Sequence, residues 1–248
     1  MRVKVAGAGP DLVLLHGWGM HADVWDEVAA SLARQFRVHS VELPAAAGVP
    51  DALDAIVGTV AAASAPRAIV CGWSLGGQLA LRWAKLKPDQ VTRLVLIATP
   101  PRFVRAPDWV HGMEPAVFDT FVQNLAQDVD GTVQRFLLLQ AHGDTAARKV
   151  VRRLRECVAA RGNLDIAALA AGLQILKNTD LRSDLPAIGQ PVLVVHGEHD
   201  AVVPPGAGEY LQRTLPHAEL EIIAGAAHAP FIAQPQAVVQ RIAEFCHG

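Results

Sequence analysis

The stretch Gly72-Trp73-Ser74-Leu75-Gly76-Gly77 decides the fold. It follows an apolar run at residues 67–72 and opens a helical pattern at residues 75–87. Gly-x-Ser-x-Gly between a strand and a helix forms a sharp turn that lifts the serine hydroxyl above the sheet, at a helix N-terminus. Glycines two positions from the serine let the strand and the helix pack closely. The stretch therefore predicts a nucleophilic Ser74, against the alternative of an inert serine in a glycine-bounded turn.

Short apolar runs alternate with helical patterns on both sides of this stretch. Near-continuous apolar strands separated by helices are typical of a mostly parallel sheet that helices cover on both faces, which is the α/β class. We expect strands at residues 11–15, 36–43, 67–72, 91–98, 191–196 and 219–223, and helices at residues 24–34, 51–63, 75–87 and 234–245.

One interval breaks the alternation. Residues 101–185 contain no convincing strand, and their helical patterns fall at 115–127, 132–141, 145–159 and 166–176. Open α/β sheets bind ligands at the carboxyl ends of their strands, where an all-helical insertion covers the site. The sequence thus predicts an α/β core, residues 1–100 and 186–248, and a helical lid, residues 101–185.

A serine nucleophile in this setting needs a base, and the chain order is nucleophile, acid, base. His228 fits the base because it follows the last predicted strand and precedes the last predicted helix. His217 precedes that strand and His247 lies at the chain end, so both fit less well. We predict that His228 is the base, against the alternative of a surface histidine.

The acid is expected after the strand at residues 191–196. Asp200 ends the sequence Gly-Glu-His-Asp there, where it would orient the imidazole and stabilise its charged form. Glu198 is the nearest competitor, and a solvated turn carboxylate is the alternative. His196 and His199 have the spacing of two metal ligands, but no third ligand is in view, so no metal is expected.

The N–H groups that stabilise an oxyanion are expected from two places. His16-Gly17-Trp18-Gly19 follows the strand at residues 11–15. In acyl transfer, one donor is the residue after the nucleophile and the other comes from the loop after an early strand. These positions are Leu75 and Trp18. An ordinary glycine-rich turn with a packing tryptophan is the alternative.

Composition limits the class of partner. Of the 248 residues 51% are hydrophobic and 19% are charged, and the net charge of −2 gives no general attraction to nucleic acid or anionic membranes. No stretch is long and apolar enough for a membrane span, and residues 1–10 have no apolar signal core. The three cysteines lack metal-ligand spacing, so a reduced, cytoplasmic setting is expected.

The motifs around Ser74, Trp18, Asp200 and His228 resemble those of the α/β-hydrolase superfamily. More narrowly, the chain resembles the pimeloyl-[acyl-carrier protein] methyl ester esterases of biotin synthesis, over almost its whole length. The lid motifs select this narrower family. They are Thr-Val-Gln-Arg-Phe-Leu-Leu-Leu-Gln at 132–140, Gly-Leu-Gln-Ile-Leu-Lys at 172–177 with Asp-Leu-Arg at 180–182, and Ala-Ala-His-Ala-Pro-Phe-Ile at 226–232.

The resemblance implies a cofactor-free carboxylesterase, a monomer, that hydrolyses the methyl ester of pimeloyl-[acyl-carrier protein] through an acyl-enzyme. Ser74, Asp200 and His228 would be its triad. Trp18 and Leu75 would frame the oxyanion hole. The substrate site would consist of Trp18, Ser74, Leu75, His228 and the five residues of an acyl channel, Phe136, Leu137, Leu138, Leu139 and Gln140.

The resemblance also implies that Arg135, Arg148 and Arg152 contact the acidic carrier protein, although Gly131 replaces one basic residue of the family. By helical spacing Arg148, Arg152 and Arg155 share one face. A solvated helix face is the alternative. Residues 42–48, Glu-Leu-Pro-Ala-Ala-Ala-Gly, depart from the family pattern and predict a reshaped loop without a triad member.

Three other functions remain open at this point. The first is a general short-chain carboxylesterase without a carrier-protein partner. The second is an acyltransferase or a cofactor-free haloperoxidase on the same scaffold. The third is a ligand receptor that kept the fold without the chemistry. Dehalogenases and epoxide hydrolases are disfavoured because they use an aspartate where this chain has Ser74.

Overall fold

The computed structural model describes residues 1–46, 48–162 and 165–248. Within these residues one seven-stranded sheet runs in the order β1-β3-β2-β4-β5-β6-β7. Only the β1–β3 pair is antiparallel among these strands. The strands are β1 (Val3–Ala6), β2 (Asp11–Leu15), β3 (Arg37–Val41), β4 (Ala68–Trp73), β5 (Val91–Ile97), β6 (Val192–Gly197) and β7 (Ala218–Ile223).

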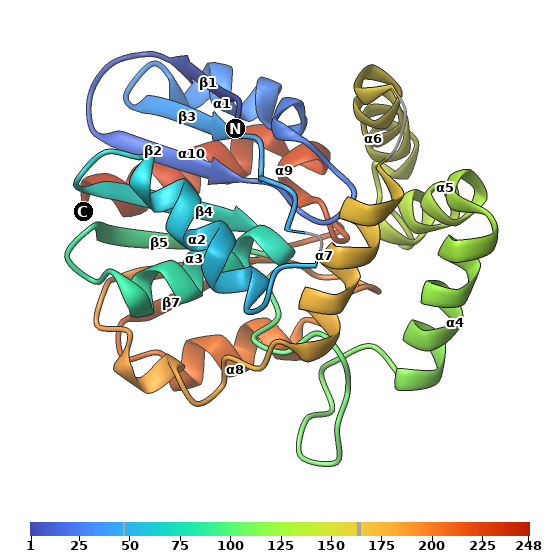
Figure 1. Cartoon of the computed structure of the whole chain (residues 1–248). Helices are drawn as coiled ribbons and strands as arrows, with labels where there is room; N and C mark the ends of the chain where they lie inside the picture. The colour runs from blue at the N-terminus through green and yellow to red at the C-terminus, as the bar shows by residue number, and fades with distance from the viewer. Residues whose placement is uncertain (47, 163–164) are drawn as a thin grey trace.

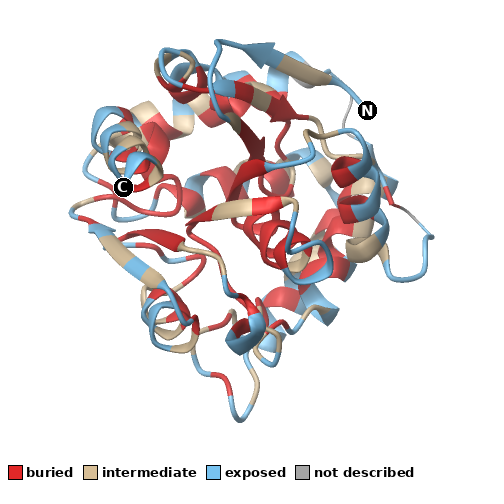
Figure 2. Cartoon of the chain, turned by 90° about the vertical axis from the view of Figure 1, so that its left-hand side faces the viewer, coloured by how far each residue is buried: buried red, intermediate tan, exposed pale blue. Residues whose placement is uncertain are grey.

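The central strands form the core because their side chains are apolar on both faces. Every residue of β4 and of β6 is buried. One row of the sheet runs from Val13 through Val70 and Leu94 to Val192, and all four side chains are at most 1% exposed. Figure 2 shows these buried strands surrounded by helices whose outer faces are exposed. Burial on both faces is what a parallel sheet between two helical layers requires.

Helices cover both faces of the sheet (Figure 1). Helices α2 (Ala52–Ala62) and α3 (Leu75–Leu86) pack together in front of it, and α1 (Asp26–Leu32) packs with α10 (Pro235–His247) behind it. Helix α8 (Gly206–Thr214) packs on β6 and β7. The remaining short elements of the core are the 3-10 helices η1 (Ala22–Trp25) and η2 (Leu185–Ala187) and the one-turn helix α9 (Pro230–Ala233). No helix in the described part of the chain is long and apolar enough to cross a membrane.

Four helices stand beside the sheet, between β5 and β6 in the chain (Figure 1). They are α4 (Pro115–Gln127), α5 (Val129–Gln140), α6 (Ala147–Arg161) and α7 (Ile166–Asn178). Among the described residues of 101–185 the only β interactions are isolated bridges. One of them joins Arg102 to Asp180 at the base of this insertion, with an ion pair of 2.8 Å. The four helices lie where the sequence predicts helical patterns, and the division into a core and a lid stays a prediction; Asn163 and Leu164 lie outside the described residues.

The predicted α/β class is confirmed, and most predicted elements agree with the structure within a few residues. Strand β1 was missed because it is short, pairs only at the sheet edge and has an exposed or half-buried side chain at every position. Helices α8 and α9 were also missed. Helix α8 has glycine at its first and third positions, and glycine disfavours a helix in a reading based on propensity.

Close backbone contacts explain the glycines around Ser74. A Cβ atom on Gly72 would overlap the carbonyl group of Gly76, and one on Gly76 would overlap the carbonyl oxygen of Leu15. A Cβ on Gly77 would overlap the side chain of Thr99. Strand β4, strand β2 and the start of α3 therefore meet at a distance that only glycine permits, as the motif predicted.

We predict that Gly76→Ala destabilises the protein by about 1–3 kcal/mol, because backbone must shift to admit the methyl group. Gly58→Ala is the matched control. Gly58 lies inside α2, where a Cβ atom would meet no described neighbour within 4 Å, so alanine there should stabilise the chain by about 0.5–1 kcal/mol. Urea unfolding of the three proteins measures both changes. Equal stability of Gly76→Ala and wild type would contradict the packing described here.

Candidate active site

Ser74 occupies a strained turn between β4 and α3. Its φ is 56° and its ψ is −114°, and a non-glycine residue with positive φ costs on the order of 1–3 kcal/mol. Two hydrogen bonds hold the turn: Ser74 N–H donates to Ile97 O at 2.9 Å, and Gly77 N–H donates to Ser74 O at 2.9 Å. Leu75 is the first residue of α3, so its N–H belongs to the helix end that lacks intrahelical partners.

His228 lies after β7, in the loop that leads to α9. Its Nδ1 is 2.8 Å from Oδ2 of Asp200, and both side chains are at most 1% exposed. The carbonyl oxygen of His228 accepts a hydrogen bond from Nε1 of Trp73 at 2.8 Å, and the two rings are 5.6 Å apart between centroids. Because Trp73 directly precedes Ser74, this bond joins the histidine loop to the serine turn.

Asp200 is a fully buried carboxylate whose two oxygens are both bonded. Its Oδ1 accepts the N–H groups of Val202 at 2.9 Å and Val203 at 2.8 Å, and its Oδ2 faces His228. Burial alone raises the pKa of Asp200. The positive charge available on His228 and hydrogen bonds from His196 and His228 outweigh burial and hold this pKa well below its usual range. Asp200 is therefore ionised at neutral pH and fixes Nδ1 of His228 as the protonated nitrogen.

Glu198, His196 and His199, the other polar residues near Asp200 in the sequence, have different partners. Glu198 is exposed and accepts the N–H of Gly225 at 2.8 Å, so it supports the histidine loop without pairing with its imidazole. His196 is fully buried, with Nε2 2.9 Å from Val203 O and 3.4 Å from Oδ2 of Asp200. His199 is about half exposed. Across the described residues, no three His, Cys, Asp or Glu side chains are grouped as metal ligands.

Trp18 connects the loop after β2 to the inserted helices. Its Nε1 donates to Leu169 O on α7 at 2.8 Å, and its ring meets the edges of Phe121 and Phe136 at centroid distances of 5.4 and 5.2 Å. Gly172 leaves room for this ring, because a Cβ there would lie 2.7 Å from it. In the same loop Nε2 of His16 accepts the N–H of Leu43 at 3.1 Å.

A small apolar cavity of about 50 Å³ lies between Trp18 and the inserted helices. Phe136 and Leu139 of α5 line it, whereas Leu137 is buried elsewhere and Leu138 is 51% exposed. Successive residues of a helix point about 100° apart, so five in a row cannot face one cavity. Of the five residues predicted for the acyl channel, Phe136 and Leu139 line this cavity, and Leu137, Leu138 and Gln140 do not. The full lining is Trp18, Phe103, Met113, Val117, Phe118, Phe121, Phe136, Leu139, Leu173 and Leu176.

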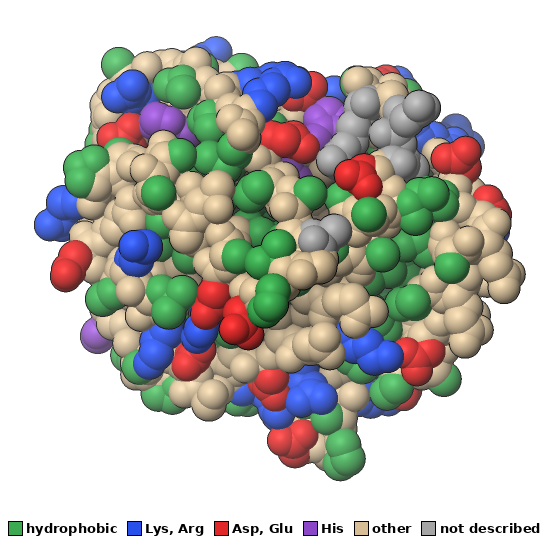
Figure 3. Space-filling view, in the orientation of Figure 1, with side chains coloured by type: hydrophobic (Ala, Val, Ile, Leu, Met, Phe, Trp, Pro, Cys, Tyr) green, Lys and Arg blue, Asp and Glu red, His purple; other side chains and the backbone are tan. Residues whose placement is uncertain are grey.

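Leu138 lies instead in a surface hollow between α5 and α6. This hollow has a volume of about 550 Å³, and its lining combines Leu138 and Val151 with Arg148, Arg152 and Arg155. Arg148 and Arg152 are exposed, and Arg152 lies 3.8 Å from Glu156. Arg135 is exposed on α5 and bonded to Thr132 Oγ1 at 3.0 Å. On the face of the molecule that Figure 3 displays, basic and acidic side chains are interspersed.

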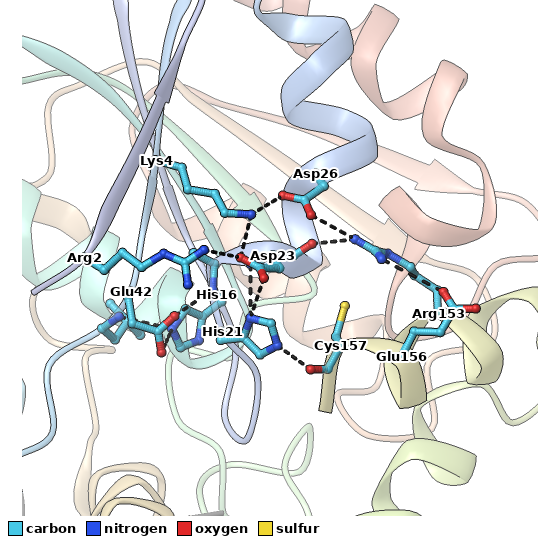
Figure 4. A network of polar contacts seen from close by, with 12 residues as sticks. Arg2, Lys4, His16, His21, Asp23, Asp26, Glu42, Arg153, Glu156 and Cys157 are labelled. Carbon is cyan, nitrogen blue, oxygen red and sulfur yellow. Dashed lines mark hydrogen bonds and ion pairs between the residues drawn. The ribbon is translucent and has the colours of Figure 1, made fainter. Parts of the chain in front are cut away.

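A polar network ties α6 to the core (Figure 4). The guanidinium group of Arg153 contacts the carbonyl oxygen of Asp23 and the carboxylate of Asp26. Nζ of Lys4, on β1, lies 2.6 Å from the carboxylate of Asp23 and 2.9 Å from that of Asp26. His21 contacts the carbonyl oxygen of Cys157 on α6. These contacts hold α6, and with it Arg148 and Arg152, in a fixed position relative to the sheet.

Sequence reasoning missed the contacts that Trp73 and Asp144 make with the histidine loop through their side chains. Trp73 lies inside the quoted motif, but nothing in the sequence reveals that its indole bonds to His228. Asp144 follows α5 and accepts the N–H of Ala227 through Oδ2 at 2.7 Å, and no motif marks it. In the atypical loop at residues 42–48, Glu42 accepts the N–H of Ala22 at 3.0 Å; Ala47 lies outside the described residues.

The model of the α/β hydrolase fold family matches residues 10–235 of this chain. The chain belongs to the α/β-hydrolase family. It is 42% identical to the pimeloyl-[acyl-carrier protein] methyl ester esterase of Nitrosomonas europaea, over 96% of both chains. It is also 42% identical to the protein of that name from Stenotrophomonas maltophilia strain K279a, over 99% of this chain and 96% of the relative.

Solved structures agree with this family. An esterase from Exiguobacterium antarcticum superposes with a TM-score of 0.88 at 19% identity, over 99% of this chain and 95% of the other. A bromoperoxidase from Bacillus anthracis superposes with a TM-score of 0.87 at 19% identity, with the same coverage. At such low identity these two matches show the α/β-hydrolase fold alone, which the sequence predicted.

The low pKa of Asp200 has a consequence for stability. A carboxyl group whose pKa falls on folding stabilises the fold above its ordinary pKa of 3.8, and this contribution is lost as the pH drops below that value. From about pH 4 to pH 3 wild type should therefore lose stability more steeply than Asp200→Asn, by up to about 1.4 kcal/mol per pH unit. Urea unfolding at several pH values measures this. Parallel curves for the two proteins would show that Asp200 has no depressed pKa.

Proposed function

We propose that this α/β-hydrolase is a serine carboxylesterase that hydrolyses the methyl ester of pimeloyl-[acyl-carrier protein], a step of biotin synthesis. The observation that carries the proposal is the 42% identity to relatives of that name over nearly the full length of both chains, the inserted helices included. The buried pair of His228 and Asp200 supports the chemistry, because a serine nucleophile needs a base of this kind to take its proton.

In the proposed mechanism Ser74 is the nucleophile. Its Oγ attacks the ester carbonyl carbon while Nε2 of His228 takes its proton, and Asp200 stabilises the imidazolium. The N–H groups of Trp18 and Leu75 bind the oxyanion. The imidazolium then protonates the departing methoxide, so that methanol leaves and an acyl-enzyme remains. A water molecule, deprotonated by His228, releases the free carboxylate and restores Ser74.

The inserted helices, residues 101–185, serve as the lid in this proposal. Trp18, Phe136 and Leu139 line an apolar cavity that suits the methylene chain of a pimeloyl group. The cavity of about 50 Å³ has room for only a few water molecules, so admitting an acyl chain requires the elements that line it to move. Gln140 contributes through its carbonyl oxygen, which accepts the N–H of His228 at 3.1 Å.

Arg135, Arg148 and Arg152 form the proposed contact surface for the carrier protein. They are exposed on α5 and α6, and the hollow beside Arg148 and Arg152 has an apolar floor. Basic groups around an apolar centre suit an acidic helical protein, because the charges steer its approach. We further propose that the protein is a cytoplasmic monomer; the three free cysteines support the reduced compartment.

Ser74→Ala is expected to lower kcat for a small soluble ester by about 10⁴–10⁶-fold, because no other group replaces the nucleophile. Steady-state kinetics measures the loss, and circular dichroism checks that the variant remains folded. Turnover close to wild type in a folded Ser74→Ala protein would exclude the serine mechanism.

Reversing the charge of Arg148 and Arg152 to glutamate is expected to raise KM for a carrier-bound methyl ester by about tenfold or more, since two attractive charges become repulsive. KM for a small soluble ester should stay within about twofold. Arg213→Glu is the control, because Arg213 is also exposed but belongs to α8 and not to α5 or α6. Equal effects on both substrates would instead favour a general short-chain carboxylesterase.

A further inference from the structure

The segment that joins α5 to α6 packs directly on the loop that carries His228. Gln140 O, at the end of α5, accepts the N–H of His228 at 3.1 Å. The N–H of Thr145, just before α6, donates to Gly225 O at 2.9 Å. Two backbone bonds therefore connect the insertion to the histidine loop, one on each side of residue 227.

Asp144 lies between these two bonds and adds a charged acceptor. Its side chain is buried, with the residue 7% exposed. Oδ2 accepts the N–H of Ala227 at 2.7 Å, and Oδ1 accepts the N–H of Ala146 at 2.7 Å. Each carboxylate oxygen thus holds one backbone amide, one from the histidine loop and one from the start of α6. Hydrogen bonds to a charged acceptor are short and about twice as strong as neutral ones.

We propose that Asp144 is a positioning residue for His228, which it serves by fixing the backbone immediately before the base. This inference rests on the proposed serine hydrolase function. Residues 224–228 are Ala-Gly-Ala-Ala-His, and Gly225 has a φ of 70°, so the loop has small side chains and a conformation favoured by glycine. Ala226 and Ala227 are fully buried, but their methyl groups alone do not set the direction of the backbone, which also depends on its hydrogen-bond partners.

The other contacts of the loop hold groups other than the N–H of Ala227, the residue directly before the base. Asp200 holds the imidazole ring through Nδ1, and Trp73 holds the carbonyl group of residue 228. On the preceding side, Glu198 bonds Gly225 from an exposed position, and His199 N–H donates to Ala226 O at 2.8 Å. Asp144 supplies the buried charged anchor there. A displacement of about 1 Å at a reacting group can lower a rate by about 10²-fold, so this anchor affects catalysis.

Helix α5 connects the apolar cavity to the proposed base. Helix α5 contributes Phe136 and Leu139 to the cavity and ends at Gln140, next to Asp144. A substrate chain that fills the cavity therefore presses on the helix whose end holds His228. Binding energy from a part of the substrate that does not react can in this way appear in kcat as well as in KM.

Asp144→Asn tests the proposal with little change of shape. The amide offers one acceptor oxygen in place of two, so one of the two backbone N–H groups loses its partner. We expect kcat for a small soluble ester to fall about 10- to 100-fold while KM stays within about twofold. Asp128→Asn is the matched control, because Asp128 accepts the N–H of Gly131 at 2.9 Å in the same insertion but far from the loop. It should leave kcat unchanged.

A second readout separates positioning from stability. Labelling by a small fluorophosphonate needs the base but no carrier protein. In Asp144→Asn the labelling rate should therefore fall in parallel with kcat. Both are measured where circular dichroism shows the variant fully folded. If Asp144→Asn unfolds there, Asp144→Ser, which keeps one oxygen acceptor, is measured in its place. A folded variant whose kcat and labelling rate lie within twofold of wild type would overturn the proposal.

Failure of the proposed function would look different. In that case wild type itself would neither hydrolyse the ester nor react with the fluorophosphonate, or Ser74→Ala would do both as well as wild type. A normal wild type and an inactive Ser74→Ala beside a fully active Asp144→Asn would refute only the positioning role.

Discussion

The left-handed backbone of Ser74 is the constraint on which the rest of the site depends. A φ of 56° at a serine is unfavourable, and it persists because β2, β4 and α3 approach one another at glycines that leave no space for relaxation. This turn places the hydroxyl at the carboxyl edge of the sheet and at the N-terminus of α3. Because β6 and β7 run parallel to β4, the loops that follow them begin at the same edge of the sheet. These loops carry Asp200 and His228.

Electrostatics then assigns the roles at this edge. Asp200 keeps its charge although it is buried, because two backbone amides and two histidines surround it. Its contact with Nδ1 fixes the tautomer of the His228 imidazole. The cysteines offer no competing nucleophile: burial raises the pKa of Cys157 and of Cys246 to about 11, so both thiols stay protonated at neutral pH. In the proposed function, Ser74 is the nucleophile that His228 activates.

The sequence was sufficient wherever local pattern determines structure. The turn at Ser74, the buried strands and the four inserted helices each have a periodicity or a motif, and the chain order pointed to His228 and Asp200. Features that arise from contacts distant in the chain were not predictable. The bond from Trp73 to His228 spans 155 residues and that from Asp144 to Ala227 spans 83, and no motif marks either. Leu138 shows a different limit, because a family motif of consecutive helical residues does not say which of them faces the cavity.

The central claim is that the hydroxyl of Ser74 is activated by His228, and the site of covalent labelling tests it most directly. The protein is incubated with a small fluorophosphonate, digested and examined by peptide mass spectrometry. The account predicts one phosphonyl group per chain, on Ser74 alone among the five serines, Ser31, Ser40, Ser64, Ser74 and Ser183. It also predicts that folded His228→Ala protein remains unlabelled on the same time scale. Labelling at another serine, or equally fast labelling without the histidine, would contradict it.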